Sequence, residues 1–408
     1  MAENVQHGPF SLEKRDIEKA RKVVENHGVK DIVEHMKTKL NEIENVTVNI
    51  AVAGVAGSGK STFINTIRGI KSRDKGGAVV GCKATTKEPT PYPFPTNANV
   101  TLWDIPGFGT EGFEREHYTE KVKLDRYDFF LIFTHKRFTE NDAWLAGEVK
   151  RQNKELFLVR THIDVDIETM KDELAETFEE SKILDQIRED TNQKLKTGPI
   201  FGMGKPRKIY LISALLRDTK KWEFENLVDD MKKILNGTQR QVLSLALCNL
   251  SEKLIKEKCD ALRARIWLVA GVCGGAGAIP IPIADGVVCG GILQRTVNDY
   301  KTKLGLDAAS LKRLSDQTGV SYEILVSTAD QYLKISVSAS TSAIVKHYAA
   351  RAGKYALSVG SRWIPVLGPV IGASLNFGTT YVLLQNILSD MEKAAIHVVK
   401  TVLKFHPT

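Results

Sequence analysis

A glycine-rich loop constrains the fold of this chain more than any other feature of its sequence. Residues 46–54 (VTVNIAVAG) form an apolar, β-branched run that predicts a buried strand. The run enters a GxxxxGK[ST] motif and a helical pattern follows, which is the context of a phosphate-binding loop rather than of a chance glycine-rich turn. Glycines there let successive backbone N–H groups converge on phosphate oxygens at a helix N-terminus. The residues expected to bind a nucleotide phosphate are Gly54, Gly57, Ser58, Gly59, Lys60, Ser61 and Thr62.

Apolar and helical patterns alternate from residue 46 to residue 238. Short apolar runs predict strands at 99–107, 127–134, 156–164 and 208–214, and helical patterns lie at 61–69, 140–152, 168–195 and 223–236. This alternation is typical of a mixed, mostly parallel sheet that helices cover on both faces. Residues 1–45 and 239–408 show only helical patterns, including one amphipathic helix over 239–265. We therefore expect an α/β domain over 46–238 and an all-α domain built from both termini.

Several residues match the roles that phosphate and Mg²⁺ chemistry requires. Lys60 should reach the β- and γ-phosphates, and the Ser61 hydroxyl should ligate Mg²⁺. Asp104 and Gly107 belong to a DxxG sequence behind an apolar run, which predicts a carboxylate near the metal and an N–H group for the γ-phosphate. The expected cofactors are GTP or GDP with Mg²⁺.

The segment between these motifs contains the candidates for a nucleotide-sensing switch. Thr85 and Thr86 could each close over Mg²⁺ when a γ-phosphate is present, although a surface threonine pair in a loop is the alternative. Phe108 stands where Ras-like enzymes carry the glutamine that orients the attacking water. We expect slow turnover unless a partner completes the site.

The choice of base is indicated by Arg160-Thr161-His162-Ile163-Asp164. GTPases usually end this strand in [NT]KxD, whose Asp accepts two hydrogen bonds from guanine. Asp164 is present, but His162 replaces the usual Lys, and an imidazole can stack on a purine. Ser213 and Ala214 fit a further guanine-contacting loop, with an ordinary strand end as the alternative. An ATP-using P-loop protein is a rival interpretation.

The distribution of charge argues against a nucleic-acid-binding protein. The formal net charge is +8, but residues 46–238 carry 30 basic and 29 acidic side chains, whereas 239–408 carry 19 and 11. The 5 cysteines form no CxxC pair, which favours a reducing compartment, and no apolar signal region begins the sequence. We expect a cytoplasmic protein.

Taken together, the motifs resemble those of the immunity-related, interferon-inducible GTPases. The resemblance rests on IAVAGVAGSGKSTFINTIRGI, VTLWDIPGFGT, DRYDFFLIFTHKRFTENDAWLA and FLVRTHIDVDI. It implies a Ras-like G domain beside a helical domain, GTP-dependent self-assembly through the nucleotide face, assembly with related GTPases, and recruitment to endomembranes or vacuoles in cell-autonomous defence. Lys60 places the chain with the GKS members, and the family's switch threonine matches Thr86.

Three positions depart from the family pattern. The family's TKVD is Thr161-His-Ile-Asp164 here, and the switch glutamate used across the dimer falls at Ala84, with Glu88 the nearest carboxylate. Ala2 excludes the myristoylation that some members carry. These departures leave a second hypothesis open, a GTP-binding regulatory scaffold with negligible turnover.

Two uncharged, glycine-rich stretches lie near the C-terminus, Trp267–Ala284 and Trp363–Ser389. Each is long enough to approach the span of a bilayer. Prolines within both would break a continuous spanning helix, so we expect burial in the helical domain, ahead of peripheral membrane docking or spanning.

Overall fold

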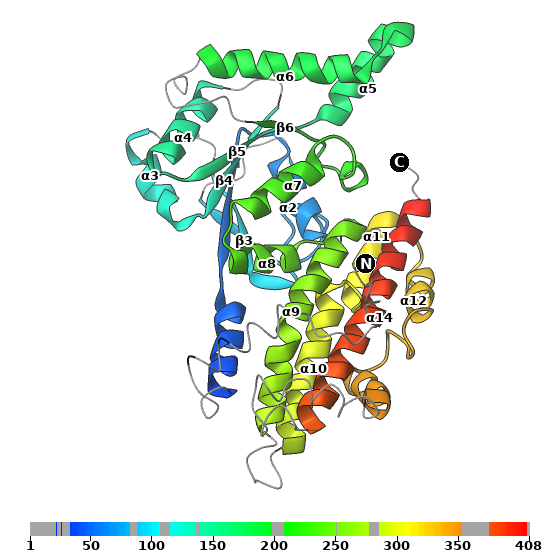
Figure 1. Ribbon diagram of the computed structural model, residues 1–408. Helices are drawn as coiled ribbons and strands as arrows, with labels where there is room; N and C mark the ends of the chain where they lie inside the picture. Colours follow the sequence, from blue (N-terminus) through cyan, green and yellow to red (C-terminus); the bar gives the residue numbers. More distant parts are fainter. Residues whose placement is uncertain are drawn as a thin grey trace, which may run out of the picture. The chain divides into compact units, whose positions relative to one another are not determined.

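Figure 1 shows the computed structural model, which describes residues 22, 26, 33–81, 88–106, 115–135, 139–197, 208–249, 251–276, 285–352 and 375–405. The chain divides into two compact units. One contains Val46–Leu250, and the other contains the residues up to Asn45 together with those from Ser251 onward. The sheet-containing unit is therefore inserted into the helical one.

A six-stranded sheet forms the centre of the inserted unit, in the order β2-β3-β1-β4-β5-β6. Every neighbouring pair is parallel except β2 and β3, which are antiparallel. The expected mixed, mostly parallel sheet is confirmed. The strands are β1 (Val48–Gly54), β2 (Thr90–Phe94), β3 (Asn97–Asp104), β4 (Phe129–Thr134), β5 (Glu155–Arg160) and β6 (Ile209–Leu211).

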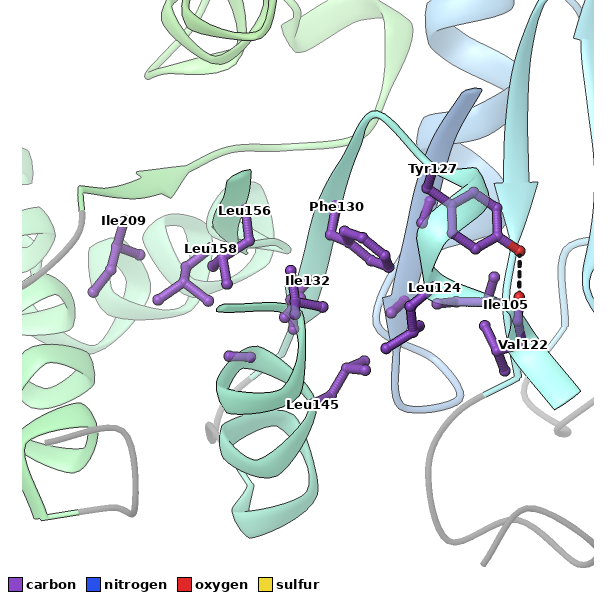
Figure 2. Close-up of a cluster of buried hydrophobic side chains, with 14 of the residues drawn as sticks. Ile105, Val122, Leu124, Tyr127, Phe130, Ile132, Leu145, Leu156, Leu158 and Ile209 are labelled. Carbon is purple, nitrogen blue, oxygen red and sulfur yellow. Dashed lines mark hydrogen bonds between the residues drawn. The ribbon is translucent and has the colours of Figure 1, made fainter. Parts of the chain in front are cut away.

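Helices pack on both faces of this sheet. On one face, α3, α4, α5 and α6 cover a cluster that includes Ala51, Ile105, Phe130, Leu145 and Leu158 (Figure 2). On the other, Phe63 of α2 lies between Phe133 of β4 and Phe224 of α7, with ring centroids 5.0 and 5.6 Å away. The helices are α2 (Lys60–Arg68), α3 (Arg115–Val122), α4 (Glu140–Arg151), α5 (Ile163–Leu174), α6 (Glu180–Thr197), α7 (Phe224–Lys233) and α8 (Gly237–Ala246), with short 3-10 turns η1 (Leu124–Arg126), η2 (Ala175–Thr177) and η3 (Leu216–Asp218).

Several boundaries differ from the sequence-based expectation. The strand expected over 156–164 ends at Arg160, because His162 takes a left-handed conformation and caps α5. The helix expected over 168–195 is two helices, α5 and α6, separated at Ala175, whose φ is 44°. The helix expected over 239–265 is likewise α8 and α9. Because α8 packs on β1 and β3, the inserted unit reaches residue 250 rather than 238.

The other unit is helical in its described residues. Helices over 33–45 and 341–352 join α9 (Glu252–Ala276), α10 (Asp285–Lys303), α11 (Ala308–Thr318), α12 (Tyr322–Asp330) and α14 (Leu375–Phe405). Helices α9 and α14 pack along each other (Figure 1).

The described parts of the two uncharged stretches lie inside this helical unit. Trp267 and Cys273 of α9 are buried, as are Phe377, Leu384 and Leu388 of α14. In the part of the chain that the structure describes, every helix is too short or too polar to cross a lipid bilayer.

Candidate nucleotide-binding site

The loop between β1 and α2 has the backbone that a phosphate cradle requires. Gly54, Gly57 and Gly59 have φ angles of 138°, 77° and 82°, a region that glycine enters without steric cost. Gly54 also packs against β4, since a Cβ there would lie 2.1 Å from the carbonyl oxygen of Phe133. Gly59 is the N-cap residue of α2, and as a glycine it brings no capping side chain of its own to this helix N-terminus.

Lys60 lies across this loop. Its Nζ donates to the carbonyl oxygens of Gly54, at 2.8 Å, and Val55, at 3.1 Å. Burial lowers the pKa of Lys60, while the carboxylates of Asp104 and Asp142 act in the opposite direction. A partly desolvated ammonium group attracts an anionic phosphate more strongly than an exposed one. The geometry fits the role expected of Lys60.

The segment after β5 is fastened to the same loop. The Thr161 hydroxyl donates to the carbonyl oxygens of Ser58, at 2.8 Å, and Thr134, at 3.2 Å. Nε2 of His162 lies 3.1 Å from the Gly57 carbonyl oxygen, and the His135 ring packs against the His162 ring at a tilt of 36°, with centroids 4.1 Å apart. Thr161 and His162 therefore link the expected base-binding segment to the expected phosphate-binding segment.

Asp164 follows in the first turn of α5 and is half-buried. The loop after β6 lies against the start of this helix, since the Ile163 N–H donates to the Ile212 carbonyl oxygen at 3.3 Å. Ser213 is fully buried, and the Ala214 carbonyl oxygen accepts a 2.7 Å hydrogen bond from the Thr66 hydroxyl. These hydrogen bonds connect the loop that contains Ser213 and Ala214 both to α5, which carries Asp164, and to α2, which follows the phosphate loop.

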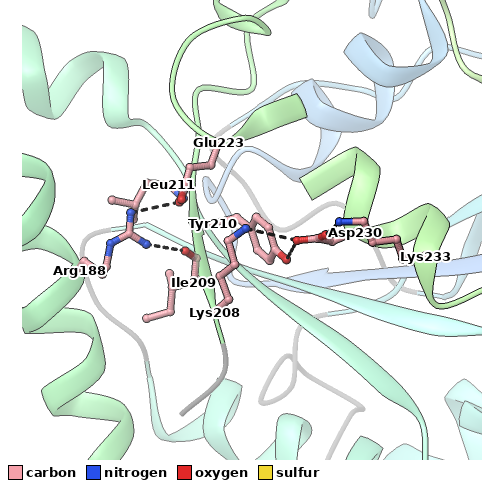
Figure 3. Close-up of polar contacts among 8 residues, drawn as sticks. All are labelled: Arg188, Lys208, Ile209, Tyr210, Leu211, Glu223, Asp230 and Lys233. Atoms are coloured by element: carbon pink, nitrogen blue, oxygen red, sulfur yellow. Dashed lines mark hydrogen bonds and ion pairs between the residues drawn. The ribbon is translucent and has the colours of Figure 1, made fainter. Parts of the chain in front are cut away.

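Polar contacts fix the position of β6, the strand that precedes Ser213 and Ala214 (Figure 3). Glu223 accepts from the Leu211 N–H at 2.9 Å and pairs with Arg188, at 3.3 Å. Asp230 accepts from the Tyr210 hydroxyl at 2.6 Å. Burial alone would raise the pKa of Asp230, but hydrogen bonds from Lys233, Tyr210 and Lys208 outweigh it and lower the pKa to about 2.

The oxygen ligands expected for Mg²⁺ lie on neighbouring elements. Asp104 ends β3 beside Val52 of β1, and Ser61 is the second residue of α2. A hydroxyl and a carboxylate are the hard donors that Mg²⁺ prefers, completed in such sites by phosphate oxygens and water. The described residues contain no group of three or more His, Cys, Asp or Glu side chains that could hold a metal alone.

Several expected site residues fall outside the described residues. These are Ala84, Thr85, Thr86, Gly107 and Phe108.

Asp142 is a residue of the site that the sequence reasoning missed. It is 4% exposed and closes a capping box at the start of α4, where its Oδ2 accepts from the Thr139 N–H, at 3.0 Å, and hydroxyl, at 2.8 Å. Burial raises the pKa of Asp142, and its carboxylate acts on Lys60. The T-x-x-D sequence of a capping box was the available signal.

A phosphate loop between a parallel strand and its helix, joined to the segment at the carboxyl end of β5, is the architecture of a P-loop nucleotide-binding protein. The comparison with known families agrees. The model of the family "Interferon-inducible GTPase (IIGP)" matches residues 13–347. The chain belongs to this family of interferon-inducible GTPases.

Individual relatives cover most of the chain. Interferon-inducible GTPase 5 of Rattus norvegicus is 30% identical over 387 residues, which is 95% of this chain and 82% of the relative. T-cell-specific guanine nucleotide triphosphate-binding protein 2 of Mus musculus is 34% identical over 74% of this chain and 71% of its own. Interferon-gamma-inducible GTPase 10 of Mus musculus is 31% identical over 78% of this chain and 74% of the relative.

Proposed function

We propose that this chain is a GTP-hydrolysing, dynamin-like GTPase that self-assembles and acts at intracellular or vacuolar membranes in cell-autonomous innate immunity. The observation that carries the proposal is the junction of phosphate loop and base segment, in which Thr161 and His162 bind the backbone of Ser58 and Gly57. Mg²⁺, held by Ser61 and Asp104 with Thr86, would neutralise phosphate charge when bound.

The chain's own residues supply binding and orientation. Lys60 exchanges its two carbonyl partners for phosphate oxygens, and Asp164 accepts hydrogen bonds from guanine. With Phe108 following Gly107, the chain lacks the usual water-orienting glutamine at that position, so we propose slow turnover that a neighbouring protomer stimulates.

Two exposed valines support self-assembly. Val79 is 63% exposed and Val80 is 53% exposed, next to Ala78, which hydrogen-bonds to α2. Among the described residues they are the only two large, exposed apolar side chains adjacent in sequence, and exposed apolar surface can mark a site that a partner covers. Peripheral membrane binding is supported by the net charge of +8, which lies wholly in residues 239–408.

Light scattering with GTP, GDP and ATP, combined with turnover per protomer across protein concentrations, tests this function. We expect scattering with GTP only and a rate per protomer that rises with concentration. Replacing Val79 and Val80 by Ser should reduce both, whereas Ile324→Ser on α12, where the isoleucine is 41% exposed, is the matched control. A flat rate near zero would favour the regulatory scaffold. Phe108 supports that alternative, because it stands where Ras-like enzymes carry the water-orienting glutamine.

Sedimentation with anionic vesicles tests the membrane part separately. Binding that depends on the anionic lipid fraction and weakens with salt is the expected result. Equal recovery with neutral vesicles would contradict the role of the charge.

A further inference from the structure

The strand that leads to the base segment (residues 161–164) ends in a buried charge. Arg160 is the last residue of β5 and is 6% exposed, and the four residues before it are apolar and buried. Burying a guanidinium group is costly unless its donors find partners. The partners of Arg160 therefore indicate what this side chain does.

Arg160 bridges the two ends of the turn from β5 into α5. Its Nη1 donates to the Thr161 carbonyl oxygen, and its Nη2 pairs with Oδ2 of Asp166 at 2.5 Å, in the first turn of α5. Burial lowers the pKa of Arg160, whereas the carboxylates of Asp166 and Asp190 act in the opposite direction. One planar group thus holds a backbone carbonyl and a carboxylate at once, a fork that only arginine provides.

The bridged turn has an unusual backbone. His162 has φ and ψ angles of 60° and 30°, a left-handed conformation that residues other than glycine rarely adopt. Its carbonyl oxygen accepts from the Asp166 N–H at 3.1 Å, and its Nε2 lies 3.1 Å from the Gly57 carbonyl oxygen of the phosphate loop. In sequence, His162 and Asp164 both lie between the two residues that Arg160 holds.

Two carboxylates of this turn differ in their partners. Asp166 is bound to Arg160, and its side chain is 20% exposed. Asp164 is half-buried, and its carboxylate makes no hydrogen bond or ion pair within the part of the chain that the structure describes. Because the arginine pairs with Asp166, the neighbouring carboxylate keeps its acceptors for a ligand.

The stability of the sheet does not account for the Arg160–Asp166 pair. Replacing a buried ion pair by apolar side chains often leaves a protein equally stable or makes it more stable. The backbone at the end of β5 is also held without this side chain, because the Ile212 N–H donates to the Arg160 carbonyl oxygen at 2.9 Å and the Thr161 N–H to the Thr134 carbonyl oxygen at 3.0 Å. The guanidinium therefore fixes the turn that follows the strand rather than the strand itself.

We propose that Arg160 is a positioning residue that holds Asp164 where it accepts both hydrogen bonds from guanine. It sets the preference for guanine over hypoxanthine, a purine base that lacks the 2-amino group, and leaves the binding of phosphate to the phosphate loop. This inference rests on the proposed function in that Asp164 is assigned to guanine.

The test compares the dissociation constants of GDP and IDP, which share their ribose and phosphates. They are measured by fluorescence on the full chain with Mg²⁺, below the protein concentration at which scattering begins. Losing one hydrogen bond to a charged group weakens binding by about 10–100-fold, so the parent should bind GDP at least about tenfold more tightly than IDP.

Arg160→Lys keeps the charge but replaces the fork by a single nitrogen. We expect the preference for GDP to fall to about threefold or less, chiefly because GDP binds more weakly. Arg151→Lys is the matched control, since Arg151 pairs with Glu148 at 2.8 Å at the C-terminal end of α4. It should keep the preference of the parent.

A merely structural role would give a different pattern. Weakening of GDP and IDP by the same factor, or no weakening of either, would overturn the proposal. The second variant combines Arg160→Met with Asp166→Leu and so replaces the pair by apolar side chains. It should fold and lose the preference for GDP, and it decides the question if Arg160→Lys does not fold. A double variant that fails to fold would show that the pair serves stability, which would contradict the proposal.

Asp164→Asn separates this inference from the function on which it rests. A preference for GDP that Asp164→Asn abolishes and Arg160→Lys leaves intact would overturn the role of Arg160 alone. A preference that survives Asp164→Asn would contradict the assignment of Asp164 to guanine and, with it, the role of Arg160.

Discussion

Gly54→Ala should destabilise the inserted unit even without nucleotide. The new Cβ would lie 2.1 Å from the Phe133 carbonyl oxygen, at the end of the β1–β4 pairing, and the residue would keep a φ of 138°. An alanine in such a backbone region costs about 1–2 kcal/mol, and overpacking of this kind costs about 1–3 kcal/mol more. The sum is about 2–5 kcal/mol.

Gly57→Ala is the matched control. Its φ of 77° is also positive, but a Cβ there has no heavy atom within 4 Å, so only the backbone cost of about 1 kcal/mol remains. In a unit of this size, 1 kcal/mol shifts the melting temperature by roughly 2–4 °C. We therefore expect Gly54→Ala to melt about 10 °C below the parent and Gly57→Ala only a few degrees below it.

Circular dichroism of the nucleotide-free full chain measures the melting temperature, and hydrogen exchange of β1 and β4 localises the effect. The reasoning predicts faster exchange at the β1–β4 pairing in Gly54→Ala and not in Gly57→Ala. Equal melting temperatures for the two variants would refute the claim that the Phe133 contact fixes this glycine.

Three further predictions concern the site and its support. Lys60→Met should weaken GTP and GDP binding by about 10–100-fold, measured by fluorescence titration, without lowering the melting temperature, because the ammonium group is already desolvated. Asp164→Asn should shift binding preference from GTP toward XTP in a competition assay, and an unchanged preference would contradict the base assignment. Asp230 has a folded pKa of about 2 and an unfolded one of about 3.9, so its contribution is present above pH 4 and lost as the pH falls toward 2. The free energy of unfolding, measured in urea, should therefore fall between pH 4 and pH 2 by about 1 kcal/mol less in Asp230→Asn than in the parent protein. This figure allows for screening by solvent.

The sequence predicted the sheet well where the strands are continuous and apolar. The runs over 46–54, 99–107 and 127–134 correspond to β1, β3 and β4. Strand β2 (Thr90–Phe94) was missed because its sequence, TPYPF, contains two prolines, which are tolerated only because β2 lies at the edge of the sheet.

The sequence motifs of the site could be predicted, but the long-range hydrogen bonds that hold these motifs together could not. The phosphate loop has a local sequence signature, whereas the contacts of Thr161 with Ser58 and of Thr66 with Ala214 join residues more than 100 positions apart. Some of the buried side chains of α2, such as Arg68, are polar, so an amphipathic pattern assigns them to solvent. Only the tertiary packing shows that Arg68 faces inward.

The insertion of the sheet unit into the helical one has a consequence for synthesis on the ribosome. Residues 33–45 belong to the same unit as α9 and α10, with a Glu44–Arg295 ion pair at 3.1 Å, yet roughly 200 residues separate the two parts of that unit. At about 5–20 residues per second, the emerging N-terminal helix spends on the order of 10–40 s without its permanent neighbours. Meanwhile Val46–Leu250 becomes available as a complete folding unit. A ribosome-bound chain halted far enough beyond residue 250 for Val46–Leu250 to have left the exit tunnel should therefore already protect its phosphate loop from protease while leaving residues 33–45 open to cleavage.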